Sequence, residues 1–252
     1  MPVEVTPPST TPPSSTPPSA LPAPPGVSLL DGTGSRGLSM ARTLGSEEPD
    51  QVSQPGRRVL IGWTGPGDAA VFNRVGSAQS LPRDLSLAPD RSLLQAFVPE
   101  LKALRGSELS ASGKAAWFPL FAGLQAEVHA TLPTSCAAAG AECGVSILGD
   151  GDKETKVVLS TELGLVLVDA TGQGNTAIRG GPMPAASASG GWDVHLYVDH
   201  SIIEIIVSNA TAFVVYANPT EGAGRVAMIG APEDPSGARL TAWTLKSPAH
   251  AY

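Results

Sequence analysis

After Pro25 the sequence is a succession of short apolar runs that are cut by Gly, Pro, Asp and Asn. The runs are rich in Val, Ile and Leu, and no stretch of about 12 residues keeps the apolar period of a helix. Short, turn-bounded runs of this composition are typical of β-strands. The sequence therefore predicts an all-β protein. We expect strands at residues 38–44, 58–63, 80–87, 120–132, 144–148, 156–160, 163–169, 192–199, 202–207, 212–216, 225–229 and 238–245.

The distribution of these runs predicts four segments. Residues 1–28 include ten of the 24 prolines, in a Thr-Pro-Pro-Ser repeat that cannot bury apolar surface, so this segment is expected to be disordered. Residues 29–88 contain three strand candidates. Residues 89–105 are expected to form a linker with a short helix near residues 98–105. Residues 106–252 contain nine candidates, which suits a two-sheet β-sandwich.

Charge and hydropathy exclude two classes of function. The net charge is −7 and the pI is about 5.1. Lys and Arg are scattered along the chain, so we expect no nucleic-acid partner. No apolar run reaches the roughly 18 residues of a membrane span. No signal peptide is visible, because Met1 is followed by Pro, Glu and Thr without an apolar region.

Two features bear on covalent modification. Cys136 and Cys143 are seven positions apart, and this spacing leaves open a small disulfide loop or two free thiols. Asn209-Ala210-Thr211 is a sequon for N-glycosylation, which fits a secreted protein.

The stretch 197-YVDHSIIEIIV-207 predicts a hairpin with its turn at His200-Ser201. In this register facing residues have numbers that sum to 401. One face of the pair is then entirely apolar, and the other face is mixed. The apolar face comprises Val194, Leu196, Val198, Ile203, Ile205 and Val207.

The reactive residues of this hairpin could form a catalytic triad, form a glycosidase pair, or have a structural role only. Asp199, His200 and Ser201 are adjacent, so their side chains alternate in direction and are not expected to form a catalytic triad. Asp199 and Glu204 share a face at a separation of roughly 5–8 Å, a range that overlaps that of a retaining glycosidase pair. We favour a structural interpretation, in which Asp199 bonds the turn backbone and Glu204 pairs across the strand or with a basic neighbour, because a catalytic pair here would lie on an open sheet face rather than in a pocket.

Several segments together resemble glycoside hydrolase family 32, the invertases, fructan hydrolases and fructosyltransferases. Pro82 and Arg83 match the family's "slPRelsl" strand, and Asp199, Ser201 and Glu204 match its "vDrSsvEvF" strand. The segments occur in the family's order and cover about residues 30–246. They are 57-RRVLIGWTG-65, 78-AQSLPRDLSL-87, 93-LLQAFVPELKALR-105, 163-LGLVLVDATGQGN-175, 196-LYVDHSIIEIIV-207 and 216-YANPT-220.

The resemblance implies an architecture. Family members have a five-bladed β-propeller that carries the active site, followed by a β-sandwich. This chain would contain part of the last propeller blade (29–88), the linker (89–105) and the sandwich (106–252). Trp63 corresponds to a Trp near the floor of the propeller funnel, so it would stack on a sugar or belong to the core of the blade. A lone partial blade exposes an edge, which predicts packing on the sandwich, a partner chain that covers it, or a truncated gene product.

The family's catalytic motifs are missing from this sequence. There is no Trp-Met-Asn-Asp-Pro-Asn-Gly-like nucleophile motif and no fitting Arg-Asp-Pro motif. Glu142-Cys143 resembles the acid/base motif, but it falls inside the expected sandwich. We therefore assign no catalytic residue, metal or cofactor.

Two functions remain open from the sequence. In the first, the chain is an inactive C-terminal portion of an enzyme whose parent activity hydrolyses β-fructofuranosyl bonds in sucrose or fructans. In the second, it is a non-catalytic carbohydrate-binding or interaction module. The resemblance and the Asn209 sequon point to an extracellular or vacuolar protein.

Overall fold

The computed structural model describes the chain in twelve stretches, and the statements below concern these residues. They are residues 27–29, 38–45, 57–64, 78–112, 118–119, 124–137, 142–150, 153–175, 177–187, 190–220, 224–230 and 238–246. Strands dominate them, and the described helices are three short 3-10 helices, η1 (Pro99–Leu104), η2 (Thr134–Ala137) and η3 (Thr171–Gln173). The predicted all-β fold class is confirmed.

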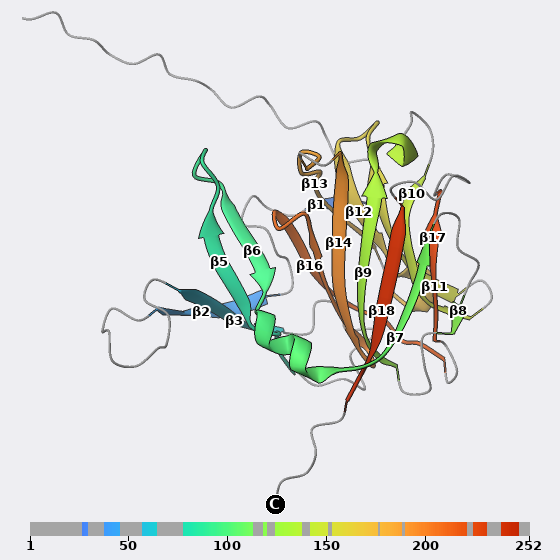
Figure 1. Ribbon diagram of the computed structural model, residues 1–252, viewed down its shortest axis with the longest axis horizontal. Helices are drawn as coiled ribbons and strands as arrows, with labels where there is room; N and C mark the ends of the chain where they lie inside the picture. The colour runs from blue at the N-terminus through green and yellow to red at the C-terminus, as the bar shows by residue number, and fades with distance from the viewer. Residues whose placement is uncertain are drawn as a thin grey trace, which may run out of the picture.

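Two sheets form the sandwich (Figure 1). The six-stranded sheet has the order β16 (Thr211–Tyr216), β15 (Ile202–Val207), β14 (Gly191–Asp199), β9 (Gln125–Pro133), β18 (Arg239–Leu245) and β7 (Arg105–Ser112). The seven-stranded sheet has the order β1 (Val27–Leu29), β13 (Ile178–Pro182), β12 (Leu165–Asp169), β11 (Lys153–Ser160), β10 (Cys143–Asp150), β17 (Arg225–Ile229) and β8 (Phe118–Pro119).

A third sheet lies beside the sandwich (Figure 1). Its order is β2 (Leu38–Gly45), β3 (Arg58–Thr64), β5 (Arg83–Leu87) and β6 (Leu93–Phe97), and β4 (Ala78–Gln79) also pairs with β3. We call these five strands the side sheet. The helix η1 follows β6 and leads directly into β7, so it joins the side sheet to the sandwich.

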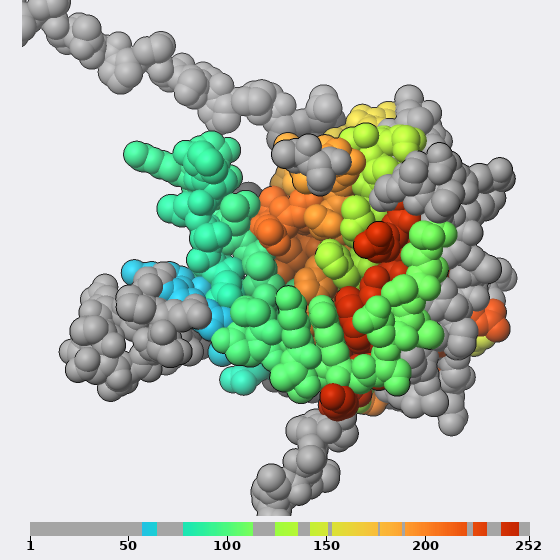
Figure 2. Space-filling model, viewed as in Figure 1, coloured from blue at the N-terminus to red at the C-terminus, as the bar shows by residue number. Residues whose placement is uncertain are grey.

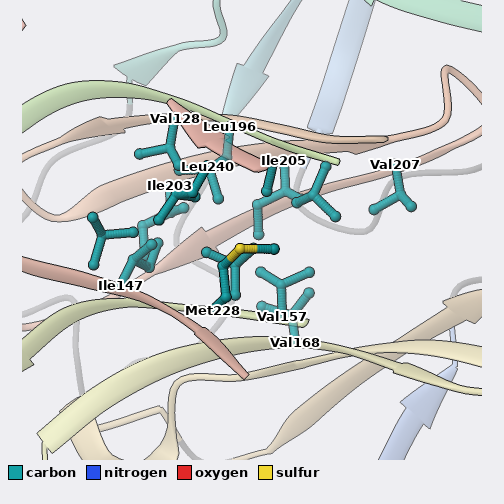
Figure 3. Packing of buried hydrophobic residues seen from close by; sticks show 14 of the residues in the cluster. Val128, Ile147, Val157, Val168, Leu196, Ile203, Ile205, Val207, Met228 and Leu240 are labelled. Atoms are coloured by element: carbon teal, nitrogen blue, oxygen red, sulfur yellow. The ribbon is translucent and has the colours of Figure 1, made fainter. Parts of the chain in front are cut away.

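The core of the sandwich is apolar and comes from alternating positions of both sheets. Leu196, Ile203 and Ile205 of the six-stranded sheet face Val157 and Met228 of the seven-stranded sheet (Figure 3). All five are between 0% and 6% exposed. Because successive side chains of a strand point to opposite sides, this core uses only the inner face of each sheet, and the outer face takes no part in it.

The predicted hairpin register is confirmed. Val194 faces Val207, Leu196 faces Ile205 and Val198 faces Ile203, as the sum of 401 requires. Strands β15 and β17 have the predicted bounds, and η1 occupies the predicted helical region.

Several stretches differ from the predictions, including β13, which no predicted strand covers. The N-terminal residues of the predicted linker include β6, which pairs with β5. Strand β7 was not predicted, because its sequence RGSELSAS lacks an apolar face and most of it is exposed at the edge of its sheet. The segment predicted to be disordered ends in β1, which pairs with β13, while residues 1–26 lie outside the described residues.

Candidate functional site: the junction between the side sheet and the sandwich

The side sheet and η1 cover part of the outer face of the six-stranded sheet. A second apolar cluster lies between them, with Phe97, Val98 and Leu101 on one side and Tyr197, Ile206 and Ala212 on the other. Figure 2 shows the β5–β6 hairpin beside the orange strands of the six-stranded sheet and η1 below it, with part of the outer face still visible. Of the three expectations for residues 29–88, the described strands of this segment therefore fit packing on the sandwich.

A buried ion pair fixes this contact. Arg83 on β5 donates from Nη2 to Glu204 Oε2 on β15 at 2.7 Å, and from Nη1 to Gln95 Oε1 at 3.0 Å. The backbone N–H of Leu81 donates to Glu204 Oε1 at 2.6 Å. Arg83 is 0% exposed and Glu204 is 3% exposed. Burial raises the pKa of Glu204, although Arg83 and the Leu81 N–H act against this rise. Because charge-assisted hydrogen bonds depend on geometry, this pair fixes the position of the side sheet on the six-stranded sheet.

Further polar contacts hold the same interface. The hydroxyl of Tyr216, at the end of β16, donates to Thr64 Oγ1 at 2.8 Å and lies 3.1 Å from the Thr64 carbonyl oxygen. The backbone N–H of Gln95 donates to the carbonyl oxygen of Asn209 at 2.7 Å. Both ends of β16 are therefore tied to the side sheet, which covers what would otherwise be an open outer face at this edge.

These contacts correct the predicted surroundings of Glu204. The sequence placed it on an open face, where it would pair across the strand or with a basic neighbour. The basic neighbour is Arg83. In the structure it faces Tyr197 in the predicted register, but its carboxylate is buried under the side sheet. A signal was present, since Ile202, Ile206 and Tyr197 share its face and are too apolar for a solvated surface. The Pro82-Arg83 and Glu204 motifs had been identified separately, 121 residues apart, and sequence alone gave no reason to pair them.

Asp199 is at the rim of the junction and its side chain is 65% exposed. Its Oδ1 accepts a hydrogen bond from Gln125 Nε2 at 2.8 Å and lies 2.9 Å from His200 Nδ1. His200 has a φ of 53°, so the turn brings its ring beside the preceding carboxylate. Asp199 and His200 therefore contact each other, although adjacent side chains of an extended strand point to opposite sides. Ser201 accepts a hydrogen bond through its carbonyl oxygen from the backbone N–H of Ala217.

A cavity of about 290 Å³ opens at the same junction. Both acidic residues of the hairpin, Asp199 and Glu204, border it. It is lined by Ala78, Gln79, Leu81, Leu104, Gln125, Tyr197, Val198, Asp199, Ile202, Glu204, Leu245 and Lys246.

A second buried cluster lies near this cavity on the same sheet face. Glu127 on β9 is 0% exposed and binds Arg105 through two hydrogen bonds of 2.7 and 2.5 Å. His195 Nε2 lies 2.8 Å from Glu127 Oε1. Burial alone would raise the pKa of Glu127, but the hydrogen bonds from Arg105 and His195 outweigh it and hold the pKa at about 2. Burial and the Glu127 charge raise the pKa of Tyr197.

Sequence reasoning did not find this cluster. Its members come from β7, β9 and β14, and each is an ordinary polar residue on the outer face of a strand. The facing pair of Tyr197 and Glu127 follows from the register of β14 with β9, which the sequence did not specify. Arg105 is the first residue of β7, so the cluster also fixes the point where the linker enters the sandwich.

The aromatic residues differ in how much of each one is exposed to solvent. Trp63 on β3 is 41% exposed and does not line the cavity. It is therefore not buried in a blade core. Trp192 and Tyr197 are 7% and 3% exposed. The guanidinium of Arg105 lies 3.7 Å from the centroid of the Trp243 ring. Trp117 lies outside the described residues.

The remaining predicted residues lie away from the junction or at its edge. Cys143 is fully buried at the start of β10 and is disulfide-bonded. The side chain of Cys136 lies outside the described residues, so the pairing of these two cysteines stays a prediction. Asn209 is exposed in the turn between β15 and β16, with a φ of 59°. Glu142 is exposed immediately before β10, inside the sandwich.

Metal-ligand groups and membrane-spanning helices are both absent from the described residues. No group of three or more His, Cys, Asp or Glu residues in this part of the chain is placed to hold a metal ion. No helix within the described ranges is long and apolar enough to cross a membrane.

The fold defines a class of protein, a β-sandwich with a side sheet clamped to one of its outer faces. No protein-family model and no curated protein matches the chain in sequence. Solved structures match it in fold. A GH32 beta-fructofuranosidase from Bombyx mori has a TM-score of 0.63 at 17% identity, over 85% of this chain and 42% of its own. Fructan 1-exohydrolase IIa from Cichorium intybus has a TM-score of 0.62 at 16% identity, over 84% of this chain and 48% of its own. Sucrose-6-phosphate hydrolase from Lactobacillus gasseri has a TM-score of 0.59 at 17% identity, over 76% and 39%.

These matches extend beyond the sandwich. Residues 105–252 make up 148 of the 252 residues, about 59% of the chain, whereas the first two matches cover 84–85% of it. The common fold therefore includes residues before β7. The chain spans less than half the length of the three solved structures named above.

Proposed function

We propose that this chain is the C-terminal portion of a protein of the glycoside hydrolase family 32 type, and that it serves as a supporting unit. The parent activity would be hydrolysis of β-fructofuranosyl bonds in sucrose or fructans. The buried Arg83–Glu204 pair is the observation that carries this proposal. It joins the two motifs that resemble the family's propeller-exit strand and sandwich hairpin, within the contact between the side sheet and the sandwich.

The unit is proposed to have no glycosidase activity by itself. A retaining glycosidase needs a nucleophile and a proton donor on the two sides of the scissile bond, with carboxyl groups about 5–5.5 Å apart. Both oxygens of Glu204 are already engaged by Arg83 and Leu81. Asp199 is at an exposed turn, and Glu142 is exposed on a different sheet. The oxygens of Glu204 are therefore unavailable as a nucleophile or proton donor in this arrangement.

The test is an assay of the purified chain with sucrose, inulin and levan. We expect no release of fructose above that of buffer. Turnover that is abolished by Glu204→Gln or Asp199→Asn, in variants that retain the wild-type circular dichroism, would contradict the proposal. A chain extended by upstream coding sequence with a Trp-x-Asn-Asp-Pro stretch is expected to release fructose and to lose this activity with Arg83→Ala.

A partner surface belongs to the same proposal. Trp63, Leu87 and Leu93 are large apolar residues of the side sheet and are 41%, 66% and 51% exposed. Leu87 and Leu93 face each other across the β5–β6 hairpin, which extends away from the sandwich (Figure 1). The matched region makes up less than half of each of these solved structures, so the proposed partner is a polypeptide that occupies the place of their unmatched part.

The exposed face of Trp63 also supports the second function, a non-catalytic carbohydrate-binding module, because an accessible aromatic ring can stack on a sugar. Retention on an inulin or cellulose column would support this function if Trp63→Ala abolished it. Recovery of the wild-type chain in the unbound flow-through of both columns would contradict this second function.

A further inference from the structure

The turn between β15 and β16 carries Asn209, which no role proposed so far uses. Ser208 and Asn209 have positive φ angles of 45° and 59°, and the backbone N–H of Ala210 donates to the carbonyl oxygen of Val207 at 3.0 Å. Two successive residues in the left-handed region are characteristic of tight turns between antiparallel strands. Asn adopts this conformation more readily than most residues, so it suits the turn for a local reason.

The backbone of this turn is held on two sides, whereas the Asn209 side chain is exposed. The carbonyl oxygen of Asn209 accepts from the N–H of Gln95 on β6 at 2.7 Å. The N–H of Ser208 donates to the carbonyl oxygen of Asp193 on β14 at 2.8 Å. A group attached to the side-chain nitrogen of Asn209 would therefore extend into solvent, beside the contact between the side sheet and the sandwich, without breaking either backbone bond.

The four asparagines of the chain differ in whether they can accept an N-linked sugar. Acceptance requires Ser or Thr two positions later and excludes Pro between the two. Asn209 meets both conditions in 209-NAT-211. Asn218 is also exposed and is followed by Thr220, but Pro219 lies between them. The other two asparagines have neither Ser nor Thr at the required position, so the sequence offers one acceptor.

A disulfide points to the compartment in which such sugars are attached. Cys143 is disulfide-bonded and 0% exposed at the start of β10. Disulfides form and persist in oxidising environments such as the lumen of the endoplasmic reticulum, and N-linked sugars belong to the surface loops of secreted proteins. The buried disulfide sulfur and the exposed acceptor are separate features that fit the same compartment.

We propose that Asn209 is N-glycosylated, and that the sugar is attached before the chain folds. The hydroxyl of Thr211 completes the acceptor motif, but Thr211 is 3% exposed and this hydroxyl donates to the carbonyl oxygen of Pro182 at 2.5 Å. The folded chain therefore presents the asparagine without the hydroxyl that a transferase must recognise. Once attached, the sugar remains on the exposed side of the turn.

The proposed co-substrate is an oligosaccharide that is linked to a lipid diphosphate. The side-chain nitrogen of Asn209 forms a bond to the anomeric carbon of the first sugar, and the bond from that carbon to the diphosphate oxygen breaks. The nitrogen loses one proton to a base of the transferase, and the lipid diphosphate leaves with the electron pair of the broken bond. The inference goes beyond the proposed function, because it concerns neither fructosides nor the support of a propeller.

The first experiment asks whether the native chain carries the sugar. The chain is isolated from the cells that produce it and treated with peptide N-glycosidase in heavy-oxygen water, which converts a glycosylated asparagine into isotopically labelled aspartate. We expect mass spectrometry of the digested chain to find this label at Asn209, while the exposed Asn218 remains unlabelled and controls for spontaneous deamidation. A native chain without the label at Asn209 would overturn the inference.

The second experiment isolates the acceptor motif. The full chain, preceded by a secretion leader, is translated with microsomal membranes, and glycosylation is measured as a gel shift that peptide N-glycosidase reverses. We expect one sugar chain on the wild type and none on Asn209→Gly, since glycine keeps the left-handed turn but lacks the acceptor. Pro219→Ala opens the motif at Asn218 and should add a second sugar chain. An unmodified wild type, beside a Pro219→Ala chain that carries sugar at Asn218 only, would contradict the assigned site.

The third experiment tests the order of events. Full chain made in bacteria is offered to the solubilised membrane transferase with its lipid-linked donor, either folded or diluted from urea at the start of the reaction. We expect modification of the chain diluted from urea and none of the folded chain. Equal modification of the two would overturn the proposed order. The fructose-release assay separates all these outcomes from the proposed function, because it can be run on the chain with and without the sugar.

Discussion

The sandwich core and the side-sheet junction are both buried, but different residues build them. The core consists of Val, Leu, Ile, Ala and a few larger apolar side chains, and its largest members are fully buried. The junction adds to a small apolar cluster an ion pair, a buried glutamine and a tyrosine–threonine hydrogen bond. Apolar burial stabilises without direction, whereas charge-assisted hydrogen bonds depend on geometry. The core therefore supplies most of the stability, and the junction sets the position of one sheet on another.

The largest expected effect comes from breaking the junction at its ion pair. Arg83→Ala leaves Glu204 as an unpaired buried carboxylate. Removal of one member of a buried pair typically costs about 3–5 kcal/mol. Denaturant unfolding followed by circular dichroism should show this loss.

Arg57 provides the matched control, since it immediately precedes β3 of the side sheet and pairs with Asp84 and Glu100, but nearer the surface. Arg57→Ala should cost clearly less than Arg83→Ala. The double variant Arg83→Met with Glu204→Leu should recover most of the lost stability, because apolar residues can replace a buried pair. A double variant as unstable as Arg83→Ala would mean that the contact is not an isolated pair.

A core substitution sharpens the comparison. Leu196 is 0% exposed and lies on the inner face of β14. Leu196→Ala should cost about 3 kcal/mol through lost burial and the cavity that remains. Urea unfolding measures it, and Leu163→Ala, at a position 38% exposed in a turn, is the control. Similar losses in the two variants would contradict the assigned core.

The acid sensitivity of the outer face should depend on Glu127. Its pKa is lowered from 4.5 to about 2 in the folded chain. The stabilisation is therefore complete above about pH 4.5 and is lost as the pH falls toward 2. We expect about 2 kcal/mol to disappear over this window, less than the full shift implies because Arg105 is partly exposed. Unfolding curves of the wild type and Glu127→Gln between pH 6 and 2 should converge at the acid end. Curves that stay parallel would contradict the assignment.

A smaller effect is expected at the rim. Asp199→Ala removes exposed contacts with Gln125 and His200 and should cost less than about 1 kcal/mol. This is the stability role predicted for Asp199, now expected to be weak. Thermal unfolding at neutral pH measures this loss. A loss as large as that of Arg83→Ala would mean that Asp199 helps to hold the side sheet on the sandwich, as the Arg83–Glu204 pair does.

The smallest effect on stability is expected on the exposed hairpin. Leu87→Lys with Leu93→Lys should change the unfolding free energy by less than about 0.5 kcal/mol. The double variant should instead reduce self-association in light scattering at high concentration, because the exposed apolar pair is removed. Unchanged association would indicate that this surface is not the contact.

Much of the fold could be predicted because strand signals are local. Ile202–Val207 and Arg225–Ile229 are dense in branched apolar residues, and the structure has these bounds. Strand β7 could not be predicted, since its RGSELSAS sequence is exposed and its pairing depends on β18. The residues of the Glu127 cluster were also beyond local reasoning, because three strands separated along the chain bring them together.

The sequence by itself determined which residues of each strand share a face. It specified the 401 register and with it the six apolar residues of β14 and β15 that enter the core. Only the tertiary structure decided what covers the opposite face. Alternation is a local property of the backbone, whereas the pairing of Arg83 with Glu204 joins positions 121 residues apart. Through that long-range pairing Glu204 holds the side sheet on the sandwich, and the cavity lies at the same junction.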